Sequence, residues 1–282
     1  MTARFLARAA FGGCALALVA IAMSLEAHDL FLKPSAFFIA PNSELRVAVL
    51  NGTFQKSEAA VTRERLRALT LAGPSGLSQP PFTAWDTAGK ESLWRVTVGG
   101  PGTYVIGASV LPRTIRLEGE EFNSYLKEDG LPDVLAERRE RNELAQPAHE
   151  RYSKHVKAVV RAGRVSSTSG DTAFRAVFGY PAELVPLNNP YALRSGRTLR
   201  VRALVDGEAV ANQVILAGGV MNDGRRIVER SVRSDTLGDA RIAIRAPGLW
   251  YVKFIRMRRI PAGTADSVDY ESKWATLTFA VR

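Results

Sequence analysis

Histidine is the residue type in this chain with the clearest capacity for metal chemistry, and it occurs at His28, His149 and His155. If an export signal is cut after Ala27, His28 becomes the first residue and offers an α-amine and an imidazole together. Nitrogen ligands of this kind suit Ni²⁺ and Cu²⁺. A third nitrogen would come from His149 or His155, which lie about 240° apart around a helix and would not face one site together. The alternative is that His28 merely begins a strand and that the other histidines lie on a helix face with their hydrogen bonds satisfied.

Carboxylates supply the other candidate chemistry. Asp29, Glu150 and Glu271 are candidate oxygen ligands to accompany the histidines. Asp269 and Glu271 would share one face of a strand, with Asp266 close in sequence, and paired carboxylates can perform acid–base catalysis. A charged, solvent-facing start of a strand explains the same residues more simply.

Motifs that mark the common enzyme classes are absent. The sequence has no Gly-x-Ser-x-Gly nucleophile motif, no phosphate-binding glycine loop and no His-Glu-x-x-His zinc motif. We therefore predict that the protein is not an enzyme and binds no organic cofactor. Trp85, between polar and proline-rich flanks, is the tryptophan predicted to be exposed for stacking against a ligand.

The N-terminal segment has the pattern of a secretory signal peptide. Arg4 and Arg8 precede an apolar run at 11–23, and a small residue at Ala27 suits signal peptidase. The run is shorter than the roughly 20 residues that span a membrane, so cleavage is favoured over an anchor. Cleavage after Ser24 is the alternative, and it would leave no free amine on the histidine. The pattern predicts a periplasmic protein with no membrane span after cleavage.

Cysteine and charge narrow the class further. Cys14 is the single cysteine and lies inside the predicted signal, where its context is poor for lipid attachment. The mature chain would therefore have no disulfide and no thiolate metal site, and must be held together by a core. Lys and Arg number 38 against 28 Asp and Glu, a formal net charge of +10. Arginines alternate with apolar residues, as at Arg200 and Arg202, which is typical of the solvated face of a sheet rather than of nucleic-acid binding.

The elements that must position these residues are mainly β at both ends of the chain. Alternation at Leu45, Val47 and Val49, and frequent turns such as Gly99–Gly102, predict short strands of a sandwich. Periodicity predicts four parts, which are a signal peptide (1–27), an N-terminal β-sandwich domain (28–116), a helical insertion (117–165) and a C-terminal immunoglobulin-like or transthyretin-like sandwich domain (166–282).

The helical insertion is predicted from apolar spacing. His149, Tyr152, Val156 and Val159 recur at helical intervals and Gly163 follows, so the spacing predicts a helix that ends near Gly163. Two shorter helices are predicted before it from apolar residues at Phe122, Tyr125, Leu126, Leu131, Val134 and Leu135.

Several passages resemble a known family. Ala27–Pro34 is similar to an "AHDFWLxP" opening, Phe122–Leu131 to "FNxYLxEEGL" and Glu150–Ala158 to "ERYSRxAKA". These passages mark the bacterial exported domain-of-unknown-function 4198 family, whose members are often described as NikM-like subunits of nickel transport complexes. Later landmarks of the same resemblance are Asn189-Pro190-Tyr191, Val205-Asp206-Gly207 and Trp274–Phe279.

The resemblance implies an exported, nickel-related function. It makes His155, within the "ERYSRxAKA"-like passage, the preferred partner of His28, and we predict a metal site of His28, His155 and Asp29. The expected function is that of a periplasmic accessory protein that binds Ni²⁺ or a similar divalent cation for a membrane metal transporter. The alternative is a cell-envelope adhesion or assembly module that binds protein or polysaccharide without metal.

Overall fold

The computed structural model describes residues 28–164, 171–261, 263 and 267–282. The predicted signal peptide, with both of its candidate cleavage sites, lies outside these residues, as does Asp266. Within the described ranges, no helix is long and apolar enough to cross a membrane.

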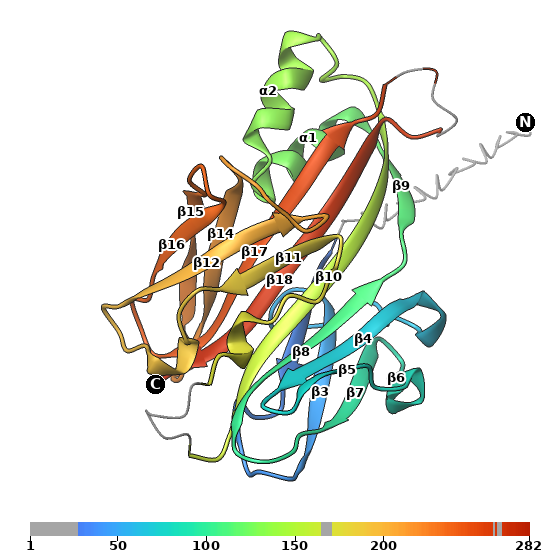
Figure 1. The fold of residues 1–282 in the computed structure, drawn as a ribbon. Helices are drawn as coiled ribbons and strands as arrows, with labels where there is room; N and C mark the ends of the chain where they lie inside the picture. The colour runs from blue at the N-terminus through green and yellow to red at the C-terminus, as the bar shows by residue number, and fades with distance from the viewer. Residues whose placement is uncertain (1–27, 165–170, 262, 264–266) are drawn as a thin grey trace, which may run out of the picture.

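Three β-sheets make up most of the fold (Figure 1). Sheet A contains β1 (Asp29–Pro34), β3 (Glu44–Gly52), β7 (Glu91–Thr97) and β6 (Trp85–Ala88), in that spatial order. Sheet B is ten-stranded, with β15 (Arg226–Arg233), β14 (Val214–Met221), β17 (Gly248–Arg259), β18 (Tyr270–Val281), β10 (Ala148–Ala162), β8 (Gly102–Val110), β4 (Leu66–Gly73) and β5 (Gly76–Ser78) in order, and with β2 (Phe38–Ile39) and β9 (Arg113–Leu117) also paired to β10. Sheet C contains β11 (Ala182–Pro186), β12 (Thr198–Val205), β13 (Glu208–Ala209) and β16 (Asp239–Ala243).

Helices are short and lie in the connections. The α-helices are α1 (Gly119–Glu128) and α2 (Pro132–Glu140), both between β9 and β10. The 3₁₀ helices are η1 (Arg63–Arg65), η2 (Phe82–Ala84), η3 (Ala173–Arg175) and η4 (Pro190–Ala192). The predicted mainly β class and the two short helices of the middle segment are therefore confirmed.

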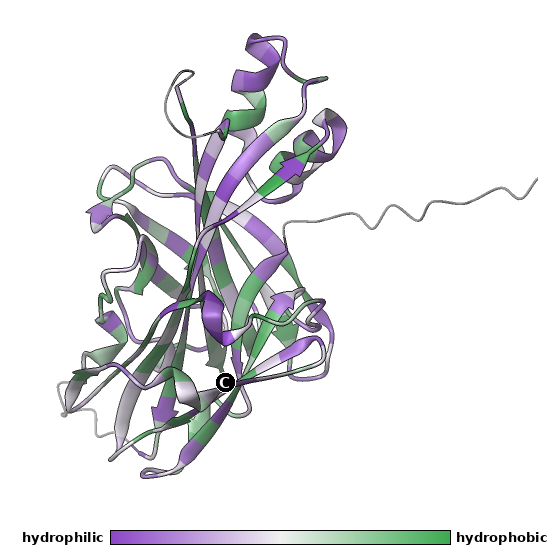
Figure 2. Cartoon of the chain, turned by 90° about the vertical axis from the view of Figure 1, so that its right-hand side faces the viewer, coloured by the Kyte–Doolittle hydropathy of each residue, from purple (hydrophilic) through white to green (hydrophobic). Residues whose placement is uncertain are grey.

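Sheet B is the wall shared by two cores, one on each face. Along β10, Val156, Ala158 and Val160 belong to the cluster formed with sheet A, whereas Val159 belongs to the cluster formed with sheet C. Successive side chains of a strand point to opposite faces, so one strand can supply both cores. Figure 2 shows hydrophobic and hydrophilic residues alternating along many of the strands. A third cluster packs α1 onto β17 and β18, on the same face as sheet A.

The predicted helix from His149 to Gly163 is wrong, because this segment is the fifteen-residue strand β10. It pairs with β18 in parallel and with β8 and β9 in antiparallel orientation. Both faces of β10 are covered, so its apolar residues do not alternate with exposed polar ones, and the alternation that marks a half-buried strand is missing. Lys154, His155 and Lys157 are polar but buried, and they interrupt the apolar residues of the strand. The apolar residues that remain are spaced as they would be on one face of a helix.

One residue of sheet B offers a direct test of its close strand packing. A Cβ added at Gly219 in β14 would collide with the backbone oxygen of Leu249 in the neighbouring strand β17, which cannot swing aside. We expect Gly219→Ala to lower the free energy of unfolding by about 1–3 kcal/mol, as overpacking does. Gly100→Ala is the control, since nothing lies within 4 Å of its added Cβ. Urea unfolding of both variants checks this, and equal stabilities would contradict the strand spacing.

Candidate functional site

An acidic pocket of about 610 Å³ lies between the start of β1 and helix α1. His28 lies at one side of it, with Gly52 and Thr53 from the end of β3. The opposite side is the end of β9 and the exposed face of α1. The carboxylates that line the pocket are Asp29, Glu58, Glu118, Glu120, Glu121, Glu128 and Asp129. No lysine or arginine is among its lining residues, although the whole chain is basic.

Helix α1 presents its acidic residues to the pocket because its other face is buried. Phe122 and Leu126 are fully buried in the core beneath it. Glu118 caps the helix and forms a reciprocal capping box with Glu121, which satisfies backbone N–H groups of the first turn. Acidic residues in this turn also complement the positive end of the helix. The helix therefore begins with carboxylates for reasons of its own stability, and these same carboxylates line the pocket.

His28 is paired with Glu58 across the pocket's edge. The Nε2 atom of His28 lies 3.2 Å from Oε2 of Glu58, and the two side chains are 24% and 38% exposed. Glu58 is positioned by the turn after β3, where its backbone N–H donates to the Asn51 carbonyl at 2.9 Å. The His28 carbonyl accepts a hydrogen bond from the buried ammonium of Lys154, so the backbone of this residue is anchored. An imidazole and a carboxylate are thus held together at a partly open position.

The ammonium of Lys253 lies between Asp29 and Asp129 and forms an ion pair with each. The Lys253 ammonium lies 2.5 Å from Oδ2 of Asp29 and 2.9 Å from Oδ1 of Asp129. Burial raises the pKa of Asp129 to about 6, against the opposing effect of Lys253. Burial also lowers the pKa of Lys253, but the two carboxylates outweigh it and the net pKa rises. Within the described chain, Oδ1 of Asp29 is buried and has no hydrogen-bond partner.

A second buried layer lies beneath the pocket. The Lys154 ammonium is 5.1 Å from the ring centroid of Tyr152 and 4.8 Å from that of Trp274, and burial lowers its pKa to about 8. Glu150 accepts hydrogen bonds from the hydroxyls of Ser272 and of Tyr125, the latter at 3.2 Å. Burial raises the pKa of Glu150 to about 7. The predicted ligand Glu150 is therefore a buried support of the pocket wall, through Tyr125.

Glu150 makes stability depend on pH. Its folded pKa of about 7 lies above the ordinary value of 4.5, so the folded protein binds more protons than the unfolded chain between these values. Stability therefore falls as pH rises from about 4.5 to 7, by at most about 1.4 kcal/mol per pH unit. We expect Glu150→Gln to remove this loss. The free energy of unfolding of the variant, relative to that of the wild type, should therefore increase from pH 5 to pH 8. Urea unfolding at both pH values measures it, and parallel pH profiles would contradict the assignment.

The structure does not bring His155 to His28. Lys154 reaches toward His28, so its neighbour His155 points to the opposite face of sheet B, as strand alternation requires. There its Nδ1 is 2.8 Å from the hydroxyl oxygen of Ser109 and its Nε2 is 3.0 Å from that of Ser153. Burial lowers the pKa of His155 to about 3. The predicted combination of His28, His155 and Asp29 is thus not assembled in the described structure, because it assumed a helix where a strand lies.

His149 and the two carboxylates near it lie away from the pocket. Nδ1 of His149 donates to the Ser267 carbonyl at 2.7 Å, and its backbone N–H donates to Oδ2 of Asp269 at 2.8 Å. Glu271 is held by the guanidinium groups of Arg151 and Arg258, at 2.9 and 2.6 Å. Asp269 therefore fixes the start of β10 and Glu271 is neutralised.

Trp85, which was predicted to be exposed for ligand stacking, is fully buried in the core of sheet A. Its indole N–H donates to the Val61 carbonyl at 2.8 Å. Trp85 is buried because β6 places it opposite Trp94 of β7 and both rings enter the core.

Glu58 and the acidic residues of α1 line the pocket, but they are not among the site residues predicted from the sequence. A local signal for the latter was present, because residues 118–129 carry five carboxylates and one lysine in a chain with a net charge of +10. Glu58 had no such signal, since only the turn after β3 brings it to His28. Within the described residues, no preformed group of three His, Cys, Asp or Glu side chains has the geometry of a metal site.

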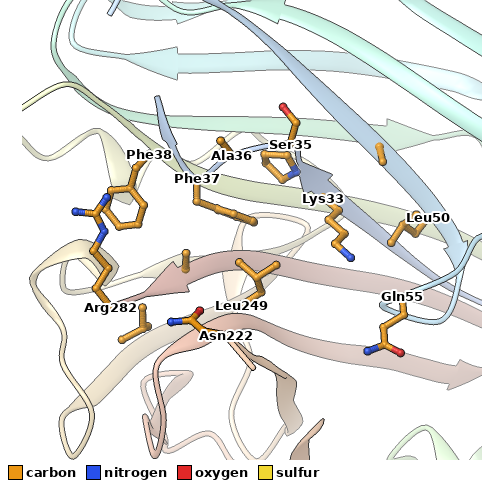
Figure 3. Close-up of a pocket in the computed structure, with 14 residues that line it drawn as sticks. Lys33, Ser35, Ala36, Phe37, Phe38, Leu50, Gln55, Asn222, Leu249 and Arg282 are labelled. Atoms are coloured by element: carbon orange, nitrogen blue, oxygen red, sulfur yellow. The ribbon is translucent and has the colours of Figure 1, made fainter. Parts of the chain in front are cut away.

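A separate groove of about 650 Å³ lies where the β1–β2 connection crosses the ends of β17 and β18 (Figure 3). Phe37 and Leu249 are on its walls, and Lys33 and Arg282 are its only ionisable lining residues. The Arg282 guanidinium lies 3.4 Å from the ring centroid of Phe38. This groove is similar in volume to the acidic pocket, but its lining residues include no cluster of groups that could ligate a cation, so we place the candidate site at the acidic pocket.

Comparisons with known proteins identify a family without an activity. A family model described as "Domain of unknown function (DUF4198)" matches residues 25–258. No curated protein matches the chain. Among solved structures, a tetra-tandem repeat from the extending region of a large adhesion protein is 12% identical with a TM-score of 0.22, over 90% of this chain and about half (49%) of that one. A two-domain fibronectin type III segment from chicken tenascin is 11% identical with a TM-score of 0.20, over 89% of this chain and 97% of that one. At these scores neither likeness carries an argument about function.

Proposed function

Because the chain belongs to the DUF4198 family, whose description names no activity, we propose a function from the acidic pocket itself. We propose an exported, periplasmic accessory protein that binds Ni²⁺ or a similar divalent cation in this pocket and passes it to a membrane metal transporter. It is not an enzyme in this proposal. The pairing of His28 with Glu58 at the edge of an acidic pocket is the observation that carries it.

Charge supports the proposal. A pocket lined by seven carboxylates and by no lysine or arginine concentrates cations, and the low-dielectric walls around it strengthen the field. The net charge of the whole chain has the opposite sign, so this attraction is local to the pocket. A cation would therefore be drawn to the side of the molecule that contains His28.

The ligand chemistry also fits a borderline metal ion. Imidazole nitrogen is a good ligand for Ni²⁺, and carboxylate oxygens complete such sites. Cleavage after Ala27 would add the α-amine of His28 to the set. Oδ1 of Asp29 is buried and has no partner among the described residues, so it is the natural further ligand, although Lys253 already balances the other oxygen. His155 has no part in this version of the site.

The arrangement of domains remains part of the proposal. We propose that the 28–116 and 166–282 sandwiches act as two domains, with the helical part of 117–165 forming one wall of the pocket. Because sheet B runs through both halves, they would move little against each other and would hold β1 and α1 at a fixed separation.

N-terminal sequencing of the exported protein, followed by Ni²⁺ and Cu²⁺ titration, tests the proposal. We expect a chain that begins at His28 and a loss of at least about tenfold in Ni²⁺ affinity in His28→Ala. His149→Ala is the matched control, because its ring hydrogen-bonds a carbonyl outside the pocket and should not affect affinity. Equal affinity in wild type and His28→Ala would remove the metal site. Metal-independent capture of an envelope protein or polysaccharide would then favour the adhesion or assembly alternative.

A further inference from the structure

The C-terminal sandwich has a side where two sheets each end in an edge strand, which pairs with a neighbour on one side only. β15 pairs only with β14 at the edge of sheet B, and β16 pairs only with β12 at the edge of sheet C, within the residues that the structure covers. An edge strand presents a row of unpaired backbone N–H and C=O groups. A cleft of about 500 Å³ lies between these two edges, with Ile227, Ile242 and Trp250 among its lining residues.

Arginine is concentrated along this side. Arg230 of β15, Arg241 of β16 and Arg245, which follows β16, line the cleft, and Arg226 is exposed on β15. Glu229 is the carboxylate among the lining residues, and it accepts a hydrogen bond from the Tyr251 hydroxyl at 2.8 Å. None of the four arginines has an ion-pair partner within the described part of the chain. Arg241 stands directly opposite Arg200 in the β12–β16 register, and Arg200 is paired with Asp239 at 3.3 Å, which leaves Arg241 as the arginine of this pair that has no carboxylate partner among the described residues.

The choice of arginine over lysine indicates that this edge binds an anionic partner and is not merely protected against aggregation. Residues 194–245 contain ten arginines, six carboxylates and no lysine. Proteins that guard an edge against aggregation use lysine in particular. Arginine instead presents a planar fork that binds carboxylates through two parallel hydrogen bonds. Val228 on the same edge is 68% exposed, which adds an apolar contact between the arginines.

From these observations we infer that the β15–β16 edge is a docking site for an acidic, extended peptide segment of a partner protein, which adds as a strand to β15. Its backbone pairs with the free edge of β15, and its carboxylates, which share one face of the added strand, meet Arg230 and Arg241 at the cleft. The unpaired backbone edge favours a peptide over an anionic polysaccharide, because a polysaccharide cannot continue the ladder of a sheet. This inference does not depend on the metal proposal, since the site is on a different part of the molecule.

Fluorescence anisotropy with labelled ten-residue peptides tests it on the purified protein at about 0.15 M salt. The probe alternates Glu and Val, and its two controls are a Lys–Val peptide and the same Glu–Val peptide N-methylated at alternate residues, which keeps the charge but cannot extend a sheet. Of the three peptides, we expect the unmodified Glu–Val peptide to bind. N-methylation should weaken its affinity at least tenfold. We also expect a tenfold loss in the double variant Arg230→Gln/Arg241→Gln.

Arg225→Gln is the matched control variant, because this arginine is exposed in the adjoining turn and already pairs with Asp223 at 2.7 Å. Its affinity should equal that of the wild type, and thermal melting should show that all variants are folded. Equal binding of the N-methylated and unmodified peptides would overturn strand addition in favour of general polyanion binding. Equal displacement of both peptides by dextran sulfate would do the same. Unchanged affinity in the double variant would overturn the site.

Discussion

Replacing Glu183 with alanine is expected to destabilise the protein by about 3–5 kcal/mol, because it leaves the ammonium of Lys157 buried without a counter-charge. Both side chains of this ion pair are almost completely buried. Glu183 also accepts hydrogen bonds from the backbone N–H groups of Phe178 and Tyr180, at 2.9 and 2.8 Å. The pair therefore fastens the segment before β11 onto β10, and urea unfolding of the variant measures its loss.

A set of variants separates the charge from the rest of the interaction. Lys157→Met combined with Glu183→Gln keeps an acceptor for the two N–H groups and removes both charges, so it should recover much of the stability lost in Glu183→Ala. Arg225→Ala, which breaks an exposed pair with Asp223, should leave the stability close to that of the wild type. A loss in Glu183→Ala no larger than in Arg225→Ala would show that this pair is not a buried support.

Replacing Lys253 with methionine is expected to cost a similar amount, about 3–5 kcal/mol, and in addition to make the protein respond more strongly to divalent cations. The substitution leaves Asp29 and Asp129 side by side without the ammonium that now lies between them. Two uncompensated carboxylates are least favourable when both are ionised, so the loss should be larger at pH 8 than at pH 5. Thermal melting at both pH values measures the loss.

Nickel should then restore part of the stability. A ligand that binds only the folded state stabilises it in proportion to the logarithm of its concentration over Kd, and the variant offers Ni²⁺ two freed carboxylates beside His28. We expect a larger Ni²⁺-induced rise in melting temperature for Lys253→Met than for the wild type. Lys273→Met, which removes a partly exposed ammonium from Asp206, is the control and should show neither effect. A Lys253→Met protein as stable as that control, or indifferent to nickel, would contradict the role of Lys253.

Local patterns in the sequence were sufficient for elements with one face in the core. The alternation of Leu45, Val47 and Val49 matches strand β3, in which these three side chains are buried and Glu44 and Arg46 are exposed. Phe122, Tyr125 and Leu126 form the buried face of α1 as expected. Such elements carry the contrast between core and solvent in their own residues, so a single sequence reveals them.

Strand β10 and the pocket depended on information that no local pattern contains. β10 is covered on both faces, and its buried Lys154, His155 and Lys157 are tolerated only because other strands supply partners for them. The pocket forms because the start of β1 lies beside α1, which is some ninety residues further along the chain. The metal-binding role of His28 and Asp29 therefore stays a prediction. The structure adds Glu58 beside His28 and Asp129 beside Asp29.

Anomalous diffraction at the nickel edge would show whether a divalent cation binds at His28 in the acidic pocket. Crystals of the exported protein soaked in Ni²⁺ would be measured on both sides of the edge, which locates nickel independently of any other ion. We expect an anomalous peak within bonding distance of a ring nitrogen of His28 and of a carboxylate oxygen of Glu58. A protein saturated with nickel whose only peaks lie outside this pocket, for example at His149, would contradict binding at His28.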